Sequence, residues 1–93
     1  MQVRAVAMTG ADQVIYTGPC EYAGFTIRET NGAVAVVQLW DNATTNSGTL
    51  LETIALSANE STSDGPWADR IRADNGIFLK KVSGAFEGSV RVG

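Results

Sequence analysis

The sequence predicts an all-β fold, a compact antiparallel β-sandwich of jelly-roll or immunoglobulin-like type with about seven or eight short strands. Turn residues recur at a spacing of roughly 8–12 residues, and short runs rich in Val, Ile and Thr lie between them. No stretch of the sequence shows the sustained 3.6-residue periodicity of a helix. The chain has 93 residues, of which 44% are hydrophobic, so it has enough apolar side chains for a single core.

The N-terminal segment, residues 1–17, is predicted to be either an extended arm or the first strands, ahead of a sandwich domain at residues 18–93. An arm would pair with the edge of a neighbouring subunit, whereas a first strand would belong to the chain's own sheet. The apolar residues Val3, Val6 and Met8 are therefore candidate interface residues. One basic residue and a short apolar run match neither a signal peptide nor a membrane span, so we expect a protein made in the cytoplasm.

A β-hairpin is predicted where residues 25–30 and 33–40 flank Asn31-Gly32. Asn-Gly between two apolar runs is the strongest short-range hairpin signal, because both residues tolerate the positive φ of a type I′ turn. Residues 33–40 are apolar on both faces, which places this strand in the middle of a sheet or beneath a second layer. We expect the last residue of this strand, Trp40, to lie in the core.

The remaining elements are a polar loop at residues 41–48 and strands at residues 13–17, 49–56, 70–72, 77–82 and 89–92. The segment from Asp41 to Glu52 has the length of an EF-hand calcium loop. Asn46 stands where that loop needs glycine, however, and the flanking segments are strands rather than helices. We therefore predict a solvated hairpin loop here and no metal ion.

The composition favours a protein without catalytic or cofactor-binding residues. The chain has no histidine, which excludes Ser-His-Asp and Cys-His catalysis and most zinc sites. Its one cysteine, Cys20, cannot form an internal disulfide and is expected to be a small buried hydrophobe. Neither of the glycine spacings that mark phosphate-binding loops occurs in the sequence.

Trp67 lies in a loop after Gly65-Pro66 and is followed by Arg70 and Arg72. A large aromatic residue in a loop is typical of a protein interface, although local packing or stacking against a sugar ring would also place a tryptophan there. These three alternatives stay open for Trp67. We take Trp67, Arg70 and Arg72 as further candidate interface residues.

The net charge of −3 is unevenly divided along the chain. Residues 1–69 carry eight acidic and two basic residues, whereas residues 70–93 carry two acidic and five basic residues. Such a division is typical of a solvated surface, or of two faces that meet different partners. A nucleic-acid-binding domain would be basic, with clustered Arg and Lys, so we expect no nucleic-acid partner and no membrane partner.

From Gly18 to Gly93 the chain resembles the small β-sandwich proteins of tailed-bacteriophage structural modules. The motifs that carry the resemblance are Gly18-Pro19-Cys20, Tyr22-Ala23-Gly24-Phe25-Thr26-Ile27-Arg28-Glu29, Val37-Gln38-Leu39-Trp40-Asp41-Asn42, Ser47-Gly48-Thr49-Leu50-Leu51, Ile54-Ala55-Leu56, Asn75-Gly76-Ile77-Phe78 and Gly88-Ser89-Val90-Arg91-Val92. Their order and spacing are similar to those of head decoration (cement) proteins and minor virion proteins.

The resemblance implies a non-enzymatic structural protein of the virion. A capsid decoration protein would bind the major capsid protein across capsomer junctions, form a homo-oligomer such as a trimer, and be located on the capsid surface. A minor tail or head–tail connector protein is the nearest alternative. A carbohydrate-binding module is an alternative of another class, and it would need Trp67 exposed beside a shallow groove.

Overall fold

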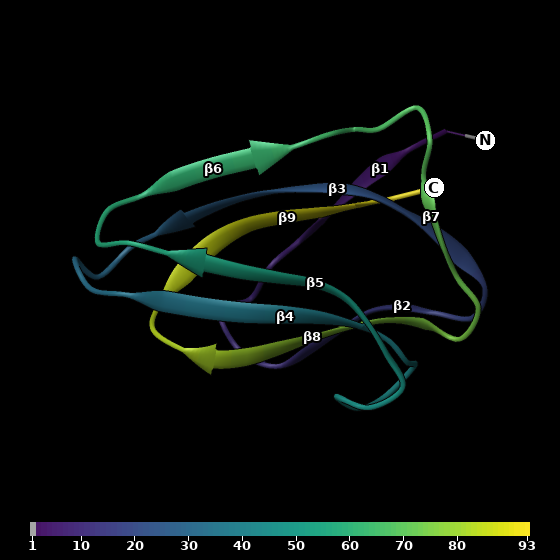
Figure 1. Cartoon of the computed structure of the whole chain (residues 1–93), viewed down its shortest axis with the longest axis horizontal. Helices are drawn as coiled ribbons and strands as arrows, with labels where there is room; N and C mark the ends of the chain where they lie inside the picture. The colour runs from purple at the N-terminus through teal and green to yellow at the C-terminus, as the bar shows by residue number, and fades with distance from the viewer. Residues whose placement is uncertain (1) are drawn as a thin grey trace.

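Two antiparallel β-sheets lie face to face in the computed structural model, which describes residues 2–93 (Figure 1). The described residues form nine strands: β1 (Arg4–Ala7), β2 (Gln13–Thr17), β3 (Cys20–Glu29), β4 (Ala35–Asp41), β5 (Thr49–Leu56), β6 (Ser61–Asp64), β7 (Ile71–Ala73), β8 (Gly76–Ser83) and β9 (Phe86–Val92). The predicted all-β sandwich is confirmed. The strand β6 was not predicted, because its small polar residues show no apolar alternation. No helix within residues 2–93 is long and apolar enough to cross a membrane.

Each sheet has two edge strands, and each side of the sandwich is bordered by one edge strand from each sheet. The first sheet has the order β1-β9-β3-β6, with β7 pairing with the first residues of β3, and the second sheet has the order β2-β8-β4-β5. The edge strands β1 and β2 lie on the same side, where the Gln13 side chain donates a hydrogen bond to the Ala7 carbonyl oxygen (2.8 Å). The edge strands β6 and β5 therefore border the opposite side (Figure 1).

The predicted hairpin at Asn31-Gly32 is wrong, because β3 and β4 belong to different sheets. Residues 30–34 instead carry the chain across from one sheet to the other. Gly32 has a φ of 69°, but Asn59 is the only non-glycine residue with a positive φ among residues 2–93, so Asn31 cannot complete a type I′ turn. The backbone N–H groups of Asn31 and Gly32 donate to the Glu29 carboxylate (2.7 and 2.8 Å).

A hairpin does form at the polar loop between β4 and β5, which pair along their full length. Asn42 closes this loop with its side-chain amide. The Asn42 Oδ1 atom accepts hydrogen bonds from the backbone N–H groups of Thr44 (2.9 Å) and Thr45 (3.1 Å). The Asn42 Nδ2 atom donates to the Ser47 carbonyl oxygen (3.2 Å). Asparagine commonly organises turns in this way, because its side chain mimics a backbone group.

The N-terminal segment contributes a strand to the chain's own first sheet. Strand β1 pairs with β9, with Arg4 opposite Val92 and Ala7 opposite Ser89. Val6 packs against the core, and Met8 is only 9% exposed. In the folded chain the side chains of Val6 and Met8 therefore contact the protein's own interior.

The core fills the space between the two sheets, and its largest fully buried apolar side chains are Tyr22, Ile27, Val37, Leu39, Leu56, Ile77, Leu79, Val90 and Val92. A bulge in β3 between Tyr22 and Gly24 shifts its register against β9. Tyr22 before the bulge and Phe25 after it are consequently both buried, although strict alternation would place them on opposite faces. Cys20 is buried in this core as expected, and burial raises the pKa of its thiol.

The central position predicted for residues 33–40 is confirmed, since β4 lies between β8 and β5. The placement of Trp40 in the core is wrong. Alternate residues of β4, including Val37 and Leu39, are completely buried, whereas Trp40 belongs to the other set and is only partly buried. Trp40 thus stands on the outer face of the four-stranded sheet.

Candidate functional site

The outer faces of the two sheets differ in chemistry. The outer face of the five-stranded sheet carries polar or small side chains from β1, β3, β6 and β9, namely Ala5, Ala7, Thr26, Arg28, Ser61, Ser63, Glu87, Ser89 and Arg91. Arg28 and Glu87 form an ion pair on this face, and the Arg91 guanidinium donates to Thr26 Oγ1 (2.8 Å). This face has the character of a solvated surface.

The outer face of the four-stranded sheet carries a row of apolar side chains that crosses all four strands. Val14 of β2 lies opposite Phe78 of β8, Phe78 lies opposite Trp40 of β4, and Trp40 lies opposite Leu50 of β5. We call these four residues the apolar row. Phe78 is 9% exposed, whereas Val14 and Leu50 at the two ends are 44% and 43% exposed. A contiguous apolar strip on the outside of a sheet is typical of a contact surface.

A polar strip runs beside the apolar row. Lys80 and Gln38 are opposite each other on β8 and β4, and the Lys80 ammonium contacts Asp12 Oδ2 (3.0 Å). The Trp40 indole N–H donates to Gln38 Oε1 (3.3 Å), which fixes the indole across the face. The apolar row is therefore bordered by hydrogen-bonding groups, as the core of a protein–protein contact commonly is.

Trp67 lies on the side of the sandwich that the edge strands β6 and β5 border. Its indole packs edge-on against Tyr22, with ring centroids 5.1 Å apart and planes at 88°. The Trp67 indole N–H donates to Asp64 Oδ1 (2.8 Å), and its backbone N–H donates to the Ala23 carbonyl oxygen (2.8 Å). Trp67 is partly buried against the core. Local packing, one of the three alternatives for Trp67, is what the structure shows.

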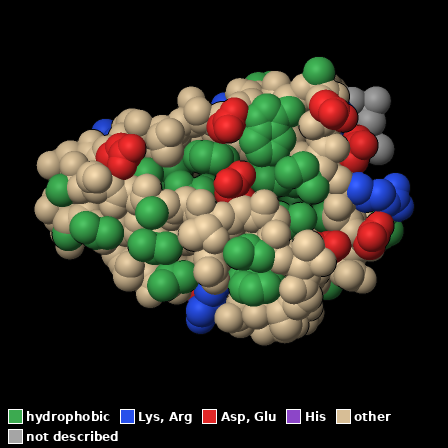
Figure 2. All heavy atoms as spheres, viewed as in Figure 1, with side chains coloured by type: hydrophobic (Ala, Val, Ile, Leu, Met, Phe, Trp, Pro, Cys, Tyr) green, Lys and Arg blue, Asp and Glu red, His purple; other side chains and the backbone are tan. Residues whose placement is uncertain are grey.

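Two carboxylates accompany these aromatic rings. The Tyr22 hydroxyl donates to Glu52 Oε1 of β5 (3.3 Å), so this hydrogen bond spans the two sheets. Burial raises the pKa of the Tyr22 phenol well above its usual value, and the nearby Glu52 and Asp64 carboxylates add to this effect. Tyr22 is therefore a neutral hydrogen-bond donor. Figure 2 shows hydrophobic surface between β6 and β5 with acidic side chains set into it.

The other predicted interface residues lie at the end of the first sheet. Val3 and the Arg70 guanidinium both approach Gly93 at the end of β9. Arg70 contacts Glu21 Oε1 (3.3 Å), and its Nε atom is buried without a hydrogen-bond partner among the described residues. Arg72 forms an exposed ion pair with Asp74 (2.8 Å). The structure thus brings Val3 and Arg70 together but keeps them apart from the apolar row.

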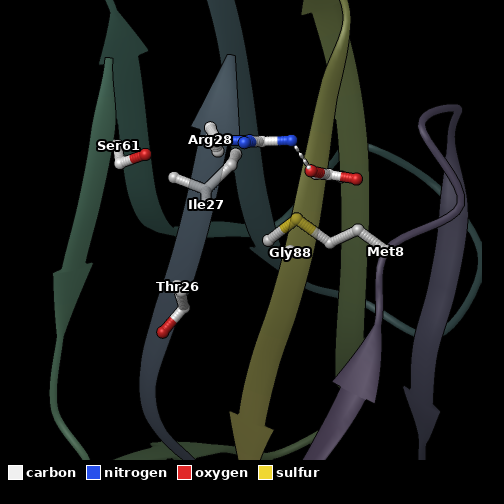
Figure 3. A pocket seen from close by; sticks show the side chains of 7 residues that line it. Met8, Thr26, Ile27, Arg28, Ser61 and Gly88 are labelled. Atoms are coloured by element: carbon white, nitrogen blue, oxygen red, sulfur yellow. Dashed lines mark hydrogen bonds and ion pairs between the residues drawn. The ribbon is translucent and has the colours of Figure 1, made fainter. Parts of the chain in front are cut away.

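An open pocket of about 570 Å³ lies over β3 and β9, between Ser61 of β6 and Met8, the residue after β1 (Figure 3). Figure 3 shows the Met8 side chain crossing β9 at Gly88 and pointing toward Ile27, with the Arg28–Glu87 ion pair beside it. A side chain at Gly88 would collide with the Thr26 carbonyl oxygen. The pocket is thus the space left by Gly88, where the close approach of β9 to β3 leaves no room for a side chain. The two charged side chains that line the pocket, Arg28 and Glu87, form an ion pair with each other.

A buried carboxylate holds two connections between the sheets in place. Glu29 is 2% exposed, and besides Asn31 and Gly32 it accepts a hydrogen bond from the backbone N–H of Asn59 (2.9 Å). Asn59 adopts a φ of 61°, which asparagine tolerates better than most residues. The Asn59 N–H, followed by the other backbone donors, lowers the pKa of Glu29. Glu29 therefore joins the β3–β4 and β5–β6 connections as an anion.

We expect Glu29→Gln to lower the melting temperature at pH 7 by about 5–10 °C, because an amide oxygen binds N–H donors less strongly than a carboxylate does. The folded pKa of Glu29 is lowered, so as pH falls below about 4.5 the unfolded state binds the proton first. The stabilisation by Glu29 is complete above that pH and is lost as pH falls through the folded pKa. Thermal unfolding followed by circular dichroism from pH 7 to pH 3 should show the two proteins converging.

Glu87→Gln is the matched control, because Glu87 is an exposed carboxylate whose ion pair with Arg28 contributes little. A Glu29→Gln variant as stable as the wild type at pH 7 would contradict the anchoring role of Glu29.

Among the described residues no group of three or more His, Cys, Asp or Glu side chains is arranged to hold a metal ion. No family model, no curated protein and no solved structure matches the chain. The described residues present two chemically different faces, and an acidic and aromatic surface between β6 and β5 (Figure 2). These are features of contact surfaces.

Sequence reasoning missed Val14, Leu50 and Phe78 as members of an outer surface. The signal that could have found them is the apolar character of both faces of residues 33–40. One of those faces is the outer face that carries Trp40, and the neighbours of Trp40 in the sheet complete the row.

Proposed function

We propose that this chain is a non-enzymatic structural protein of a bacteriophage virion, and specifically a capsid decoration protein that binds the major capsid protein and stabilises the head. The observation that carries the proposal is the apolar row on one outer face, opposite a polar outer face. A protein that coats a shell needs one face that docks and one face that stays in water. Many copies of a modest contact then add up to a stable particle.

The amount of surface fits a contact of this kind. The four strands of the second sheet, about 4.8 Å apart, and a strand length of about 24 Å give a face of roughly 450 Å². A contact of roughly 900 Å² in total falls below the usual size of a stable two-protein complex. Such a face is suited to repeated binding in a lattice, together with contacts from a homo-oligomer such as a trimer.

The test is co-sedimentation with heads of the encoding phage assembled without this protein. Val14 and Leu50 are about half exposed, so burying each would contribute about 1 kcal/mol to docking. We expect a Val14→Thr/Leu50→Thr double variant to bind heads roughly 30-fold more weakly, the equivalent of about 2 kcal/mol.

Ile71→Thr is the control, because Ile71 is exposed (42%) but lies on β7, in the other sheet. If the double variant binds like the wild type, or if Ile71→Thr weakens binding as much, docking does not use the apolar row. If the wild type fails to bind heads, the chain is not a decoration protein. Binding to purified tails or to the head–tail junction would then favour a minor tail or connector protein.

The carbohydrate-binding alternative draws on Trp67, whose indole N–H is held by Asp64 and whose ring is set at 88° to the ring of Tyr22. A sugar would have to stack on a face of this indole.

A further inference from the structure

Strand β5 has a long free edge. Its residues pair with β4 on one side, and no described strand pairs with the other side. The other edge strands are shorter: β1 and β6 have four residues each, β7 has three, and β2 has five with an irregularity between Val14 and Tyr16. Strand β5 has eight residues, and residues 52–56 run in unbroken register with β4.

Strand β5 has few of the features that normally protect an edge. It contains no proline and no lysine, and its only charged residue is Glu52, whose carboxylate is directed inward to the Tyr22 hydroxyl. Its one bulge lies at Leu51, between the residues opposite Trp40 and Leu39, and residues 52–56 beyond the bulge are regular. Natural sheets protect a long edge with charges, prolines, bulges or a covering segment, because its free N–H and C=O groups pair readily with another strand. The free edge of β5 is thus open to an added strand.

The surroundings of this edge are acidic. Glu52 and Asp64 both lie near the Tyr22 phenol, on the side of the sandwich that β6 and β5 border. The ion pairs formed within residues 2–93 use the carboxylates of Asp12, Glu21, Asp74 and Glu87. Glu52 and Asp64 accept hydrogen bonds only from the neutral groups of Tyr22 and Trp67. Their two negative charges are therefore not balanced by a cation of the described chain.

This charge decides between two possible occupants of the edge. A second copy of the chain, paired with β5 around a two-fold axis, would bring another Glu52 and another Asp64 to the same place. Like charges that meet at a contact disfavour it. A strand with basic side chains would instead place Lys or Arg beside Glu52 and Asp64.

We propose that the free edge of β5 accepts an extended segment of a different protein chain, whose side chains alternate between basic and apolar. Added to β5, such a strand directs its basic side chains to Glu52 and Asp64 on the side bordered by β5 and β6. Its apolar side chains lie on the outer face beside Leu50, where they lengthen the apolar row by one strand. Backbone hydrogen bonds supply affinity, and the alternate side chains supply specificity. This proposal does not depend on whether the partner belongs to a virion.

The probe is a synthetic seven-residue peptide of alternating Lys and Val, beginning and ending with Lys. Titration into the ¹⁵N-labelled protein at low salt should shift the amide signals of β5 and the indole N–H signal of Trp67. A peptide in which Glu replaces Lys should bind more than about tenfold more weakly, because its charges oppose Glu52 and Asp64. A Lys–Val peptide with a central proline should also bind weakly, because proline interrupts a strand ladder.

The matched protein variant is Glu52→Gln/Asp64→Asn, which removes both charges but keeps acceptor oxygens for Tyr22 and Trp67. It should bind the Lys–Val peptide about fivefold more weakly than the wild type does. The control Asp74→Asn/Glu87→Gln changes the net charge equally at other places and should bind like the wild type.

Equal binding by the proline-containing peptide, or shifts confined to β1, β2 or the outer faces, would overturn strand addition at β5. Equal weakening in both double variants would show that overall charge, rather than Glu52 and Asp64, attracts the peptide. Neither result bears on the binding of heads through the apolar row, so the two proposals can fail separately.

Discussion

Trp67→Ala is expected to lower the melting temperature of the isolated domain by about 8–16 °C. Replacing a fully buried tryptophan by alanine typically costs about 3–5 kcal/mol, and Trp67 is only partly buried, so we expect about 2 kcal/mol. In a domain of this length each kcal/mol corresponds to about 4–8 °C. The loss arises because Tyr22 loses its edge-on aromatic partner and the loop after β6 loses its attachment to Asp64. Thermal unfolding followed by circular dichroism measures it.

Trp67→Phe is the control, because phenylalanine keeps an aromatic ring against Tyr22 and removes only the indole N–H. It should lose less than half as much stability as Trp67→Ala does. An unchanged melting temperature for Trp67→Ala would mean that Trp67 is free to serve as an interface anchor, as the sequence alone favours. Any weaker binding by Trp67→Ala must therefore be compared with its effect on folding.

The sandwich class could be predicted because it depends on local signals. Glycines and polar turns separate the strands, and the alternation of buried residues in β4 is visible in the sequence. The pairing of strands is a different matter. Asn31-Gly32 has the composition of a tight hairpin, but Glu29 captures the N–H groups of both residues, and the chain crosses to the other sheet. A side chain two residues before the turn thus overrides the turn signal.

The location of the two tryptophans could not be predicted for a related reason. Trp40 ends an apolar strand and is expected inside, while for Trp67, in a loop, an interface, local packing and sugar stacking all stay open. In the structure Trp40 stands on an outer face, whereas Trp67 packs against the core. A tryptophan in a strand is buried if its side chain points toward the other sheet. A tryptophan in a loop is buried if the loop folds back over the core. Both are properties of the tertiary arrangement.

The candidate site shows the same limit. The apolar row requires Val14, Phe78, Trp40 and Leu50 to come into line, and these residues come from four strands spread over most of the chain. Irregularities in register between Val14 and Tyr16 and between Leu39 and Trp40 set this alignment. A one-residue change of register moves a side chain to the opposite face, so no pattern within a single strand could reveal the row.

Deleting residues 1–9 is expected to lower the melting temperature of the isolated domain by more than about 12 °C. The deletion removes β1 from its pairing with β9 and takes Val6 and Met8 out of the core. Burial of a methionine contributes about 1.5–3 kcal/mol, and with Val6 and the lost strand the cost exceeds about 3 kcal/mol. At about 4–8 °C per kcal/mol this gives the expected shift, measured by thermal unfolding at fixed protein concentration.

Two substitutions separate the core contribution of this segment from any contact it makes with a neighbouring subunit. Met8→Ala should reproduce much of the loss, about 2 kcal/mol or more, because Met8 fills the space beside Gly88 and Ile27 (Figure 3). Ala7→Thr should leave the melting temperature nearly unchanged, because Ala7 is exposed on the outer face of the same strand. If the deletion variant melts like the wild type but loses its binding to capsids, residues 1–9 act as an arm between subunits. Strand β1 would then contribute little to its own sheet, although it pairs with β9 in the folded chain.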